Sequence, residues 1–162
     1  MREFFFWMRE SHFGEYMRDQ QWAFSICESI HFIGVCLLFG ALLVIDIRML
    51  GYARKISIPW ALKLIPIAIF GFAINLITGI CFIFVDPFQY FTNPVFLIKM
   101  GLIVLAGINA IYHEVACKER ICALPEGADT DTRTKWIAGI SLLLWTLIIL
   151  CGRLLPQFSI EG

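Results

Sequence analysis

Residues 64–85, LIPIAIFGFAINLITGICFIFV, decide the fold of this chain, because the stretch is apolar and contains no charged residue. The hydrocarbon core of a bilayer is about 30 Å thick, and roughly 20 apolar helical residues are needed to cross it. Backbone polar groups find no water there, so a spanning segment must bond its own amides and carbonyls as a helix. Pro66 falls in the first turn, where its missing amide hydrogen is harmless. We therefore expect a transmembrane helix at about residues 63–86.

Three further stretches have similar length and character, at about residues 23–49, 94–116 and 134–155. The stretch at 94–116 follows Asn93 and begins with Pro94, a capping residue and a proline at the first helical position. The chain of 162 residues is 59% apolar, with a mean hydropathy of +0.77, which lies beyond the usual range of soluble domains. We expect an all-α integral membrane protein, with a four-helix bundle over residues 22–162 in a lipid bilayer.

The segment before the first span, residues 1–21, mixes aromatic and methionine side chains with charged ones. This pattern predicts an amphipathic helix lying in the membrane interface. The segment lacks the order of features that marks a signal peptide, so we expect none to be cleaved.

The distribution of basic residues predicts the orientation. They concentrate around the first connection, between the first and second spans, and the third connection, between the third and fourth spans. These residues are Arg48, Arg54, Lys55, Lys63, Lys118, Arg120, Arg133 and Lys135. By the positive-inside rule these connections are cytoplasmic, and both termini and the turn at 86–93 face outward.

Several functional classes are disfavoured by composition and motifs. The formal net charge is zero, so no global field attracts nucleic acid. The sequence has no nucleophile and base arrangement, no phosphate-binding glycine loop and no nucleotide fingerprint. Most of the six cysteines fall inside apolar runs, where they act as small hydrophobic residues. An electron-transfer or accessory subunit is therefore favoured over a stand-alone enzyme.

Ionisable groups inside a bilayer cost about 2.5–3.5 kcal/mol each on insertion scales, so each one is a functional candidate. The candidates are Glu28, His31, Lys99, His113 and Arg153. Glu28 and His31 share one helix face, which Gly34 continues. His31 is a possible ligand for a haem iron or a copper ion, with Gly34 leaving room for a flat macrocycle and Glu28 setting the polarity. The alternative for His31 is an interhelical hydrogen bond.

Helix geometry predicts which residues are neighbours of His31. The first and third spans run in the same direction, which places His31 and His113 at depths of roughly 13 and 28 Å, so they cannot share one iron. Lys99 and Met100 lie at roughly 8–9 Å, within a turn of His31. Lys99 could face haem propionates, pair with Glu28 or extend outward to the interface. Met100 could be an axial ligand.

Two weaker groups of possible metal ligands remain. His113, Cys117 and Cys122 could form a second metal site, although their spacing matches no strong zinc template. Met8, His12 and Met17 could hold Cu(I), but ordinary interfacial anchoring is the favoured interpretation of that segment.

Three stretches carry a resemblance to known proteins: ESIHFIGVCLLFGALLVIDIRMLG (28–51), LITG (76–79) and NPVFLIKMGLIVLAGINAIYH (93–113). They resemble a group of small bacterial four-helix membrane proteins of uncharacterised function. The layout is more distantly similar to the copper-resistance D membrane domain and to the haem-dependent J-type protoporphyrinogen oxidase. The resemblance implies that His31 is the first-helix histidine, thought to bind haem in the oxidase family, with Lys99 and His113 as the third-helix lysine and later histidine. It also implies a bacterial inner membrane, in which the orientation predicted from the basic residues would place both termini in the periplasm.

Together these observations predict a membrane subunit that binds haem b through His31 and transfers electrons to a periplasmic redox protein or within a larger membrane complex. One alternative is a copper-handling membrane protein that uses His31, Cys27 and Met100. The other is a non-catalytic accessory subunit of a larger membrane complex, for which the aromatic residues between 84 and 96 are suited to docking.

Overall fold

The computed structural model describes residues 2–116, 121–125 and 127–158, with the side chain of residue 2 left aside. These residues form helices and no strand. Four helical segments are long and apolar enough to cross a membrane: Gln21–Met49, Ile58–Val85, Pro94–Ala116 and Thr132–Phe158. The prediction of an all-α membrane protein with four spans is confirmed.

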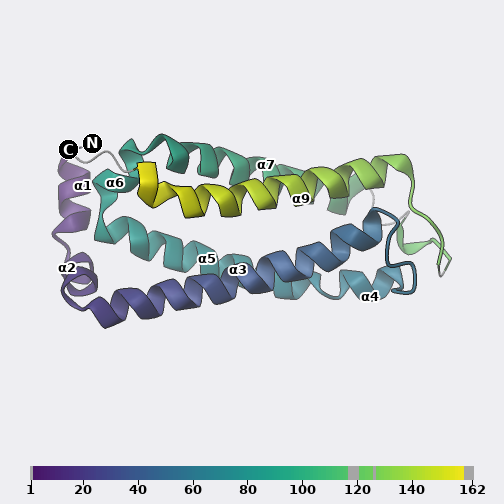
Figure 1. Cartoon of the computed structure of the whole chain (residues 1–162), viewed down its shortest axis with the longest axis horizontal. Helices are drawn as coiled ribbons and strands as arrows, with labels where there is room; N and C mark the ends of the chain where they lie inside the picture. Colours follow the sequence, from purple (N-terminus) through teal and green to yellow (C-terminus); the bar gives the residue numbers. More distant parts are fainter. Residues whose placement is uncertain (1, 117–120, 126, 159–162) are drawn as a thin grey trace.

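The four long helices form two antiparallel pairs (Figure 1). Helix α3 (Gln21–Met49) packs along α5 (Ile65–Val85), and α7 (Pro94–Ala116) packs along α9 (Thr132–Leu154). The pairs meet mainly where α3 contacts α9, while α5 and α7 barely touch in the part of the chain described. The protein is therefore a bundle of two helical hairpins.

The two helices of the first hairpin, α3 and α5, pack closely because two glycines lie at their interface, which we call the seam. A Cβ atom on Gly71 would lie 2.6 Å from the Leu38 amide nitrogen and 2.7 Å from the Gly34 carbonyl oxygen. One on Gly34 would lie 2.7 Å from the Asn75 Oδ1 atom. Small residues allow membrane helices to approach in this way, because lipid provides no hydrophobic force to drive packing.

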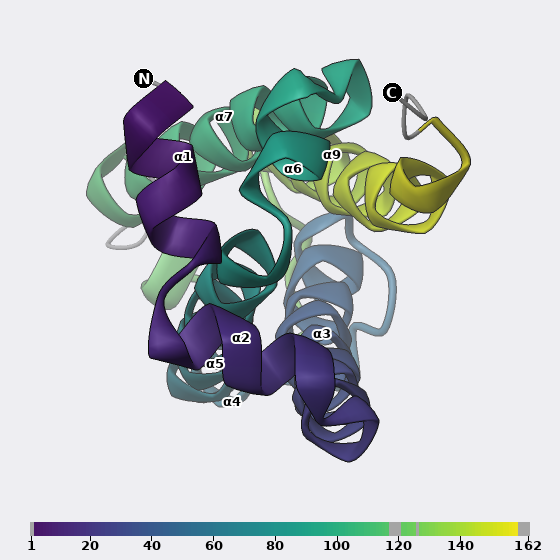
Figure 2. The ribbon, with the colours of Figure 1, turned by 90° about the vertical axis from the view of Figure 1, so that its left-hand side faces the viewer.

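The N-terminal segment forms two short helices rather than the single helix expected. They are α1 (Arg2–Arg9) and α2 (His12–Asp19), and the break occurs at Ser11, whose hydroxyl accepts a hydrogen bond from the Gly14 amide at 3.1 Å. Serine at this position satisfies an amide that the helix start leaves unpaired. Both helices lie across one end of the hairpins (Figure 2).

Aromatic contacts hold these helices to the α5–α7 turn. The Phe5 ring stacks on Phe91 at 4.9 Å and meets Phe88 edge-on, and Phe13 contacts Phe84. The aromatic surface proposed for docking is thus partly covered by the chain itself. Within the turn, α6 (Pro87–Thr92) precedes Asn93, whose side chain accepts from the Val95 amide, so the predicted cap is confirmed.

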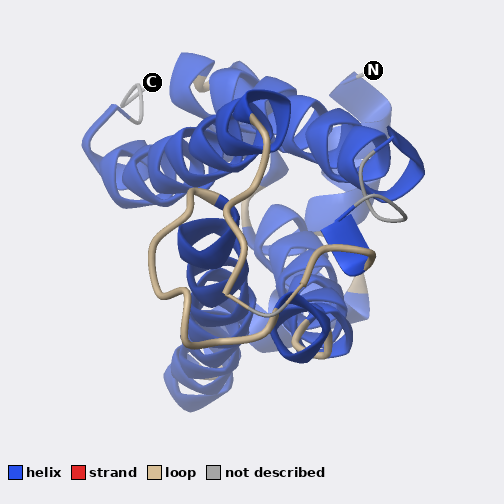
Figure 3. Ribbon diagram, turned by 90° about the vertical axis from the view of Figure 1, so that its right-hand side faces the viewer, coloured by secondary structure: helices blue, strands red, loops and turns tan. Residues whose placement is uncertain are grey.

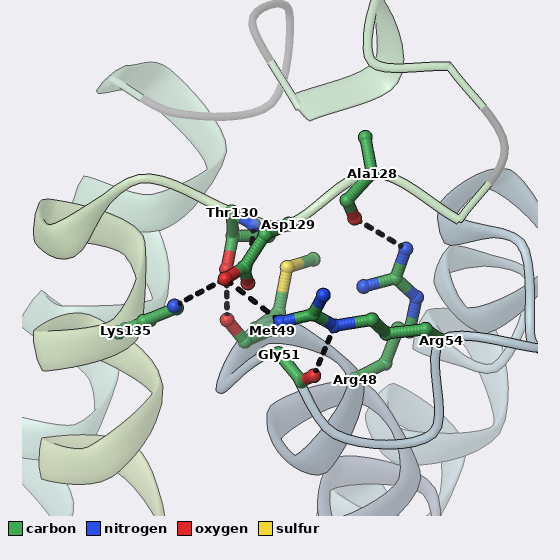
Figure 4. Close-up of polar contacts among 8 residues, drawn as sticks. All are labelled: Arg48, Met49, Gly51, Arg54, Ala128, Asp129, Thr130 and Lys135. Carbon is green, nitrogen blue, oxygen red and sulfur yellow. Dashed lines mark hydrogen bonds and ion pairs between the residues drawn. The ribbon is translucent and has the colours of Figure 1, made fainter.

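The opposite end of the molecule contains the two longer connections (Figure 3). The first includes the short helix α4 (Ile58–Leu62). At the other end, α9 is followed by the 3-10 helix η1 (Leu155–Phe158). Asp129 joins the two connections, because it accepts from Arg54 at 2.9 Å and from Lys135 at 2.8 Å (Figure 4). The hydrogen bond from Lys135 is the main reason that the pKa of Asp129 lies below its ordinary value of 3.8.

Candidate functional site

His31 lies on the face of α3 that packs against α5. Its Nδ1 atom is 2.7 Å from the Thr78 hydroxyl oxygen. Thr78 is only 5% exposed, and its hydroxyl lies 2.7 Å from the Ile74 carbonyl oxygen in the preceding turn. The predicted alternative, an interhelical hydrogen bond, is therefore present in the structure.

The Thr78 hydroxyl determines the His31 tautomer. Its single hydrogen is directed to the Ile74 carbonyl, so the oxygen can only accept from His31. Nδ1 is then the protonated nitrogen, and Nε2 keeps its lone pair. Histidines that ligate metals show this pattern, in which a hydrogen bond at one nitrogen orients the other. The hydrogen bond and the ligand role are thus compatible.

Lys99 extends from α7 into the space between the helices. A Cβ atom on Gly152 of α9 would lie 3.5 Å from the Lys99 Nζ atom, so the ammonium group lies against α9. Lys99 also acts electrostatically on His31, as predicted from their depths. The structure therefore brings the first-helix histidine and the third-helix lysine to one level of the bundle, on different hairpins.

Glu28 and Met100 lie elsewhere on their helices. Glu28 is exposed, and it interacts electrostatically with Tyr90 of α6. Met100 is 44% exposed, which places it on the outer surface of α7 rather than beside Lys99. The residue that shares the buried face with His31 is Cys27, whose thiol lies 4.0 Å from the Thr78 carbonyl oxygen.

Gly34 does not provide the space that was expected for a macrocycle. Asn75 and Ile74 of α5 fill it, at 2.7 and 2.8 Å from where a Cβ atom would be. The glycine serves helix packing instead. The ring that covers His31 belongs to Phe82, at a centroid distance of 5.2 Å.

The other candidate ligands form no comparable site. His113 is half-buried near the end of α7, and Cys122 is exposed in the third connection, while Cys117 lies outside the described residues. Met8 and Met17 are buried, and His12 is exposed. Arg153 is exposed near the end of α9. Within the described part of the chain, no three histidine, cysteine or acidic residues lie together as a metal ion would require.

Two buried charged residues were missing from the sequence candidates. Asp46 is 6% exposed and interacts with the Ser141 hydroxyl of α9, and Arg48 is 1% exposed. Arg48 donates through Nε to the Ile56 carbonyl at 2.6 Å. It also donates through Nη2 to the Ala128 carbonyl at 3.1 Å (Figure 4). Asp46 is therefore buried against α9, and Arg48 is buried against the two connections.

Comparison of the chain with family models, with curated proteins and with solved structures finds no match. The function must therefore be argued from the site. Its decisive features are a histidine whose Nδ1 is hydrogen-bonded to Thr78 and a nearby lysine toward one end of a membrane bundle.

Proposed function

We propose that this chain is a membrane subunit of electron transfer that binds haem b, with His31 as the axial ligand. The observation that carries the proposal is the Thr78 hydroxyl at the His31 Nδ1 atom, which leaves Nε2 available for iron. A bound haem would supply one-electron chemistry. The resemblance to haem-dependent membrane proteins supports the same assignment.

The surrounding residues suit such a group in charge and polarity. Lys99 supplies a cation at the level of His31, where it can neutralise a propionate. The Phe82 ring lies beside the imidazole, at a centroid distance of 5.2 Å and tilted by 57°, and adds apolar surface next to it. Met100 is not placed as a second ligand, so we assign only one axial ligand.

The basic residues of the two longer connections support a cytoplasmic location for that end. In a bacterial inner membrane, the His31 site would then lie in the periplasmic half. Electrons would pass between a quinone or inner donor and a periplasmic redox protein, or within a larger membrane complex.

A copper-handling function is the second candidate. It is favoured by the Cys27 thiol, which lies one turn from His31 on the same face, because thiols and imidazoles are suitable ligands for Cu(I). It is less well supported than haem, since Met100 faces outward and the described residues contain no group of three such ligands.

The reduced-minus-oxidised visible spectrum of the purified protein tests the proposal, together with a pyridine haemochrome assay. We expect α and Soret bands in the wild type and in His12→Ala, because His12 is exposed on α2. The bands should be lost in His31→Ala. A wild type without bands, or bands that persist in His31→Ala, would refute the assignment, and copper analysis would then test the second candidate.

A further inference from the structure

The seam between α3 and α5 places two cysteines opposite each other. Across this seam Gly71 lies opposite Leu38, Asn75 opposite Gly34 and Thr78 opposite His31. Moving three or four residues forward along α5 therefore corresponds to moving three or four residues back along α3. The next step leads to Cys27 on α3 and Cys81 on α5. Residues with this spacing share one helix face.

The contacts of the two thiols agree with this register. Cys27 is 9% exposed and belongs to a small apolar cluster with Met17 and Ala23, against which Cys81 packs. The Cys27 thiol interacts directly with the Cys81 thiol. Both cysteines are free, and Cys81 is only partly buried.

The glycines of the seam make a covalent link feasible. A disulfide requires Cα atoms about 4.4–6.8 Å apart, whereas helix axes usually lie about 8–10 Å apart. The contacts of Gly34 and Gly71 with backbone and short side-chain atoms draw α3 and α5 together two to three turns away from the cysteines. Cysteines on the outer surface of a helix, such as Cys36, have no such partner opposite them on this seam.

We propose that Cys27 and Cys81 are a redox-active dithiol that membrane quinones oxidise to an interhelical disulfide. Each thiol loses its hydrogen, one S–S bond forms, and the two electrons and two protons reduce one quinone to hydroquinone. The reaction does not require a haem at His31, so the two proposals can fail separately.

The position of the pair favours a lipid-soluble oxidant. The thiols lie between apolar helices, beneath α2, where a charged soluble disulfide would have to leave water at high cost. A quinone dissolves in the bilayer and can approach the partly buried Cys81 from the lipid side. Because Cys81 is partly exposed and Cys27 is buried, the quinone would react first with the Cys81 thiol.

The test uses the full chain in lipid nanodiscs, reduced and then freed of reductant. A fully substituted short-chain benzoquinone is added, the remaining thiols are capped with N-ethylmaleimide, and linked peptides are identified by mass spectrometry. Hydroquinone is measured in the same samples. Matched variants are Cys27→Ser, Cys81→Ser and, as a control on the same helix, Cys36→Ser.

We expect a Cys27–Cys81 linked peptide and about one hydroquinone per chain, by the stoichiometry above, in the wild type and in Cys36→Ser, whether or not the purified protein shows haem bands. Both signals should be absent in Cys27→Ser and Cys81→Ser. The proposal is wrong if the wild type has both thiols capped after quinone treatment, or if Cys81→Ser yields as much hydroquinone. The linked peptide is measured on the unmodified chain, so this result does not depend on how a variant folds.

Discussion

Thr78 has one hydroxyl hydrogen, and the Ile74 carbonyl receives it, so the His31 imidazole must donate from Nδ1. A single threonine on α5 thereby selects the nitrogen that His31 on α3 can offer to a metal. The same two residues also tie the helices together. At the residue scale, one hydrogen bond both joins the two helices and fixes the orientation of the imidazole.

Replacing Thr78 separates these roles. Thr78→Val removes the acceptor while keeping the shape, so His31 loses its preferred tautomer and orientation. Loss of such an outer partner typically costs about 10–100-fold in metal affinity. We expect a haem affinity lower by that factor in titrations of the apoprotein, with Thr78→Ser close to the wild type. Equal affinity in Thr78→Val and the wild type would contradict this role of the hydroxyl.

Tyr90 of α6 provides a pH-dependent test of burial at the end of the molecule that contains α1, α2 and α6. Burial, helped by the nearby charges of Asp86 and Glu28, raises the pKa of Tyr90 from 10.0 to about 12. The folded protein therefore keeps the phenol proton at a pH where the unfolded chain loses it. Stability attributable to Tyr90 is complete below pH 10 and falls between pH 10 and about 12. Thermal unfolding across this range should show a smaller alkaline loss in Tyr90→Phe; equal losses would show that Tyr90 is not buried in this way.

At the scale of elements, the α3–α5 pair depends on which glycines lie on its seam. Gly71 and Gly34 are in contact with the opposite helix, whereas a Cβ atom added to Gly79 or Gly40 would meet nothing within 4 Å. All four lie inside helices, where glycine is otherwise costly relative to alanine. Only the seam positions compensate for that cost by close packing.

Alanine substitutions on α5 should therefore have opposite effects. In Gly71→Ala the methyl group would meet the Leu38 backbone at 2.6 Å, so α3 must move away, at a cost of about 1–3 kcal/mol. Gly79→Ala meets no neighbour and should be neutral or stabilising by up to about 1 kcal/mol. Melting temperatures in one detergent compare the two; similar melting of both variants would argue against a close seam.

At the scale of the whole molecule, the two hairpins are joined by α3, which packs on both α5 and α9. Arg48 strengthens this junction from the end of α3, because its guanidinium bonds a carbonyl of each long connection. Its planar fork of donors can serve two acceptors, which a lysine ammonium on a flexible stem does poorly. The buried arginine thus holds both connections to one helix end.

Arg48→Ala leaves the carbonyls of Ile56 and Ala128 without their donors. Hydrogen bonds from charged groups are worth about 1.5–3 kcal/mol each, so we expect a loss of about 3 kcal/mol or more in unfolding experiments. Arg54→Ala is the control, since that arginine is exposed and its ion pair should contribute less than about 1 kcal/mol. Comparable losses in the two variants would show that Arg48 is not the main link.

Orientation in the membrane is tested through Cys122, which is exposed in the third connection. In a variant that retains only this cysteine, a membrane-impermeant maleimide should label inverted vesicles and leave intact spheroplasts unlabelled. Labelling in spheroplasts would reverse the orientation and move the His31 site to the cytoplasmic half.

The spans could be predicted from sequence because hydrocarbon excludes unpaired backbone groups wherever a run such as 64–85 occurs. The helix start at Asn93 and Pro94 followed from capping chemistry, and the common level of His31 and Lys99 followed from the rise per residue. The sequence could not show which glycines lie at an interface, because Gly71 and Gly79 both fall within the same uncharged run, 64–85. It also could not show that Met100 faces outward.

What the sequence by itself determined is therefore the solvent, the number of spans and the depth of each polar group, since these depend on local composition and on helix rise. Only the tertiary structure decided the partners: Thr78 for His31, Cys81 for Cys27 and the two carbonyls for Arg48. Partner choice depends on the rotation and register of helices that are far apart in sequence. Rotation and register are set by close packing at a few small residues. Close packing depends on two helix surfaces together, so it cannot be derived from the sequence of either helix alone.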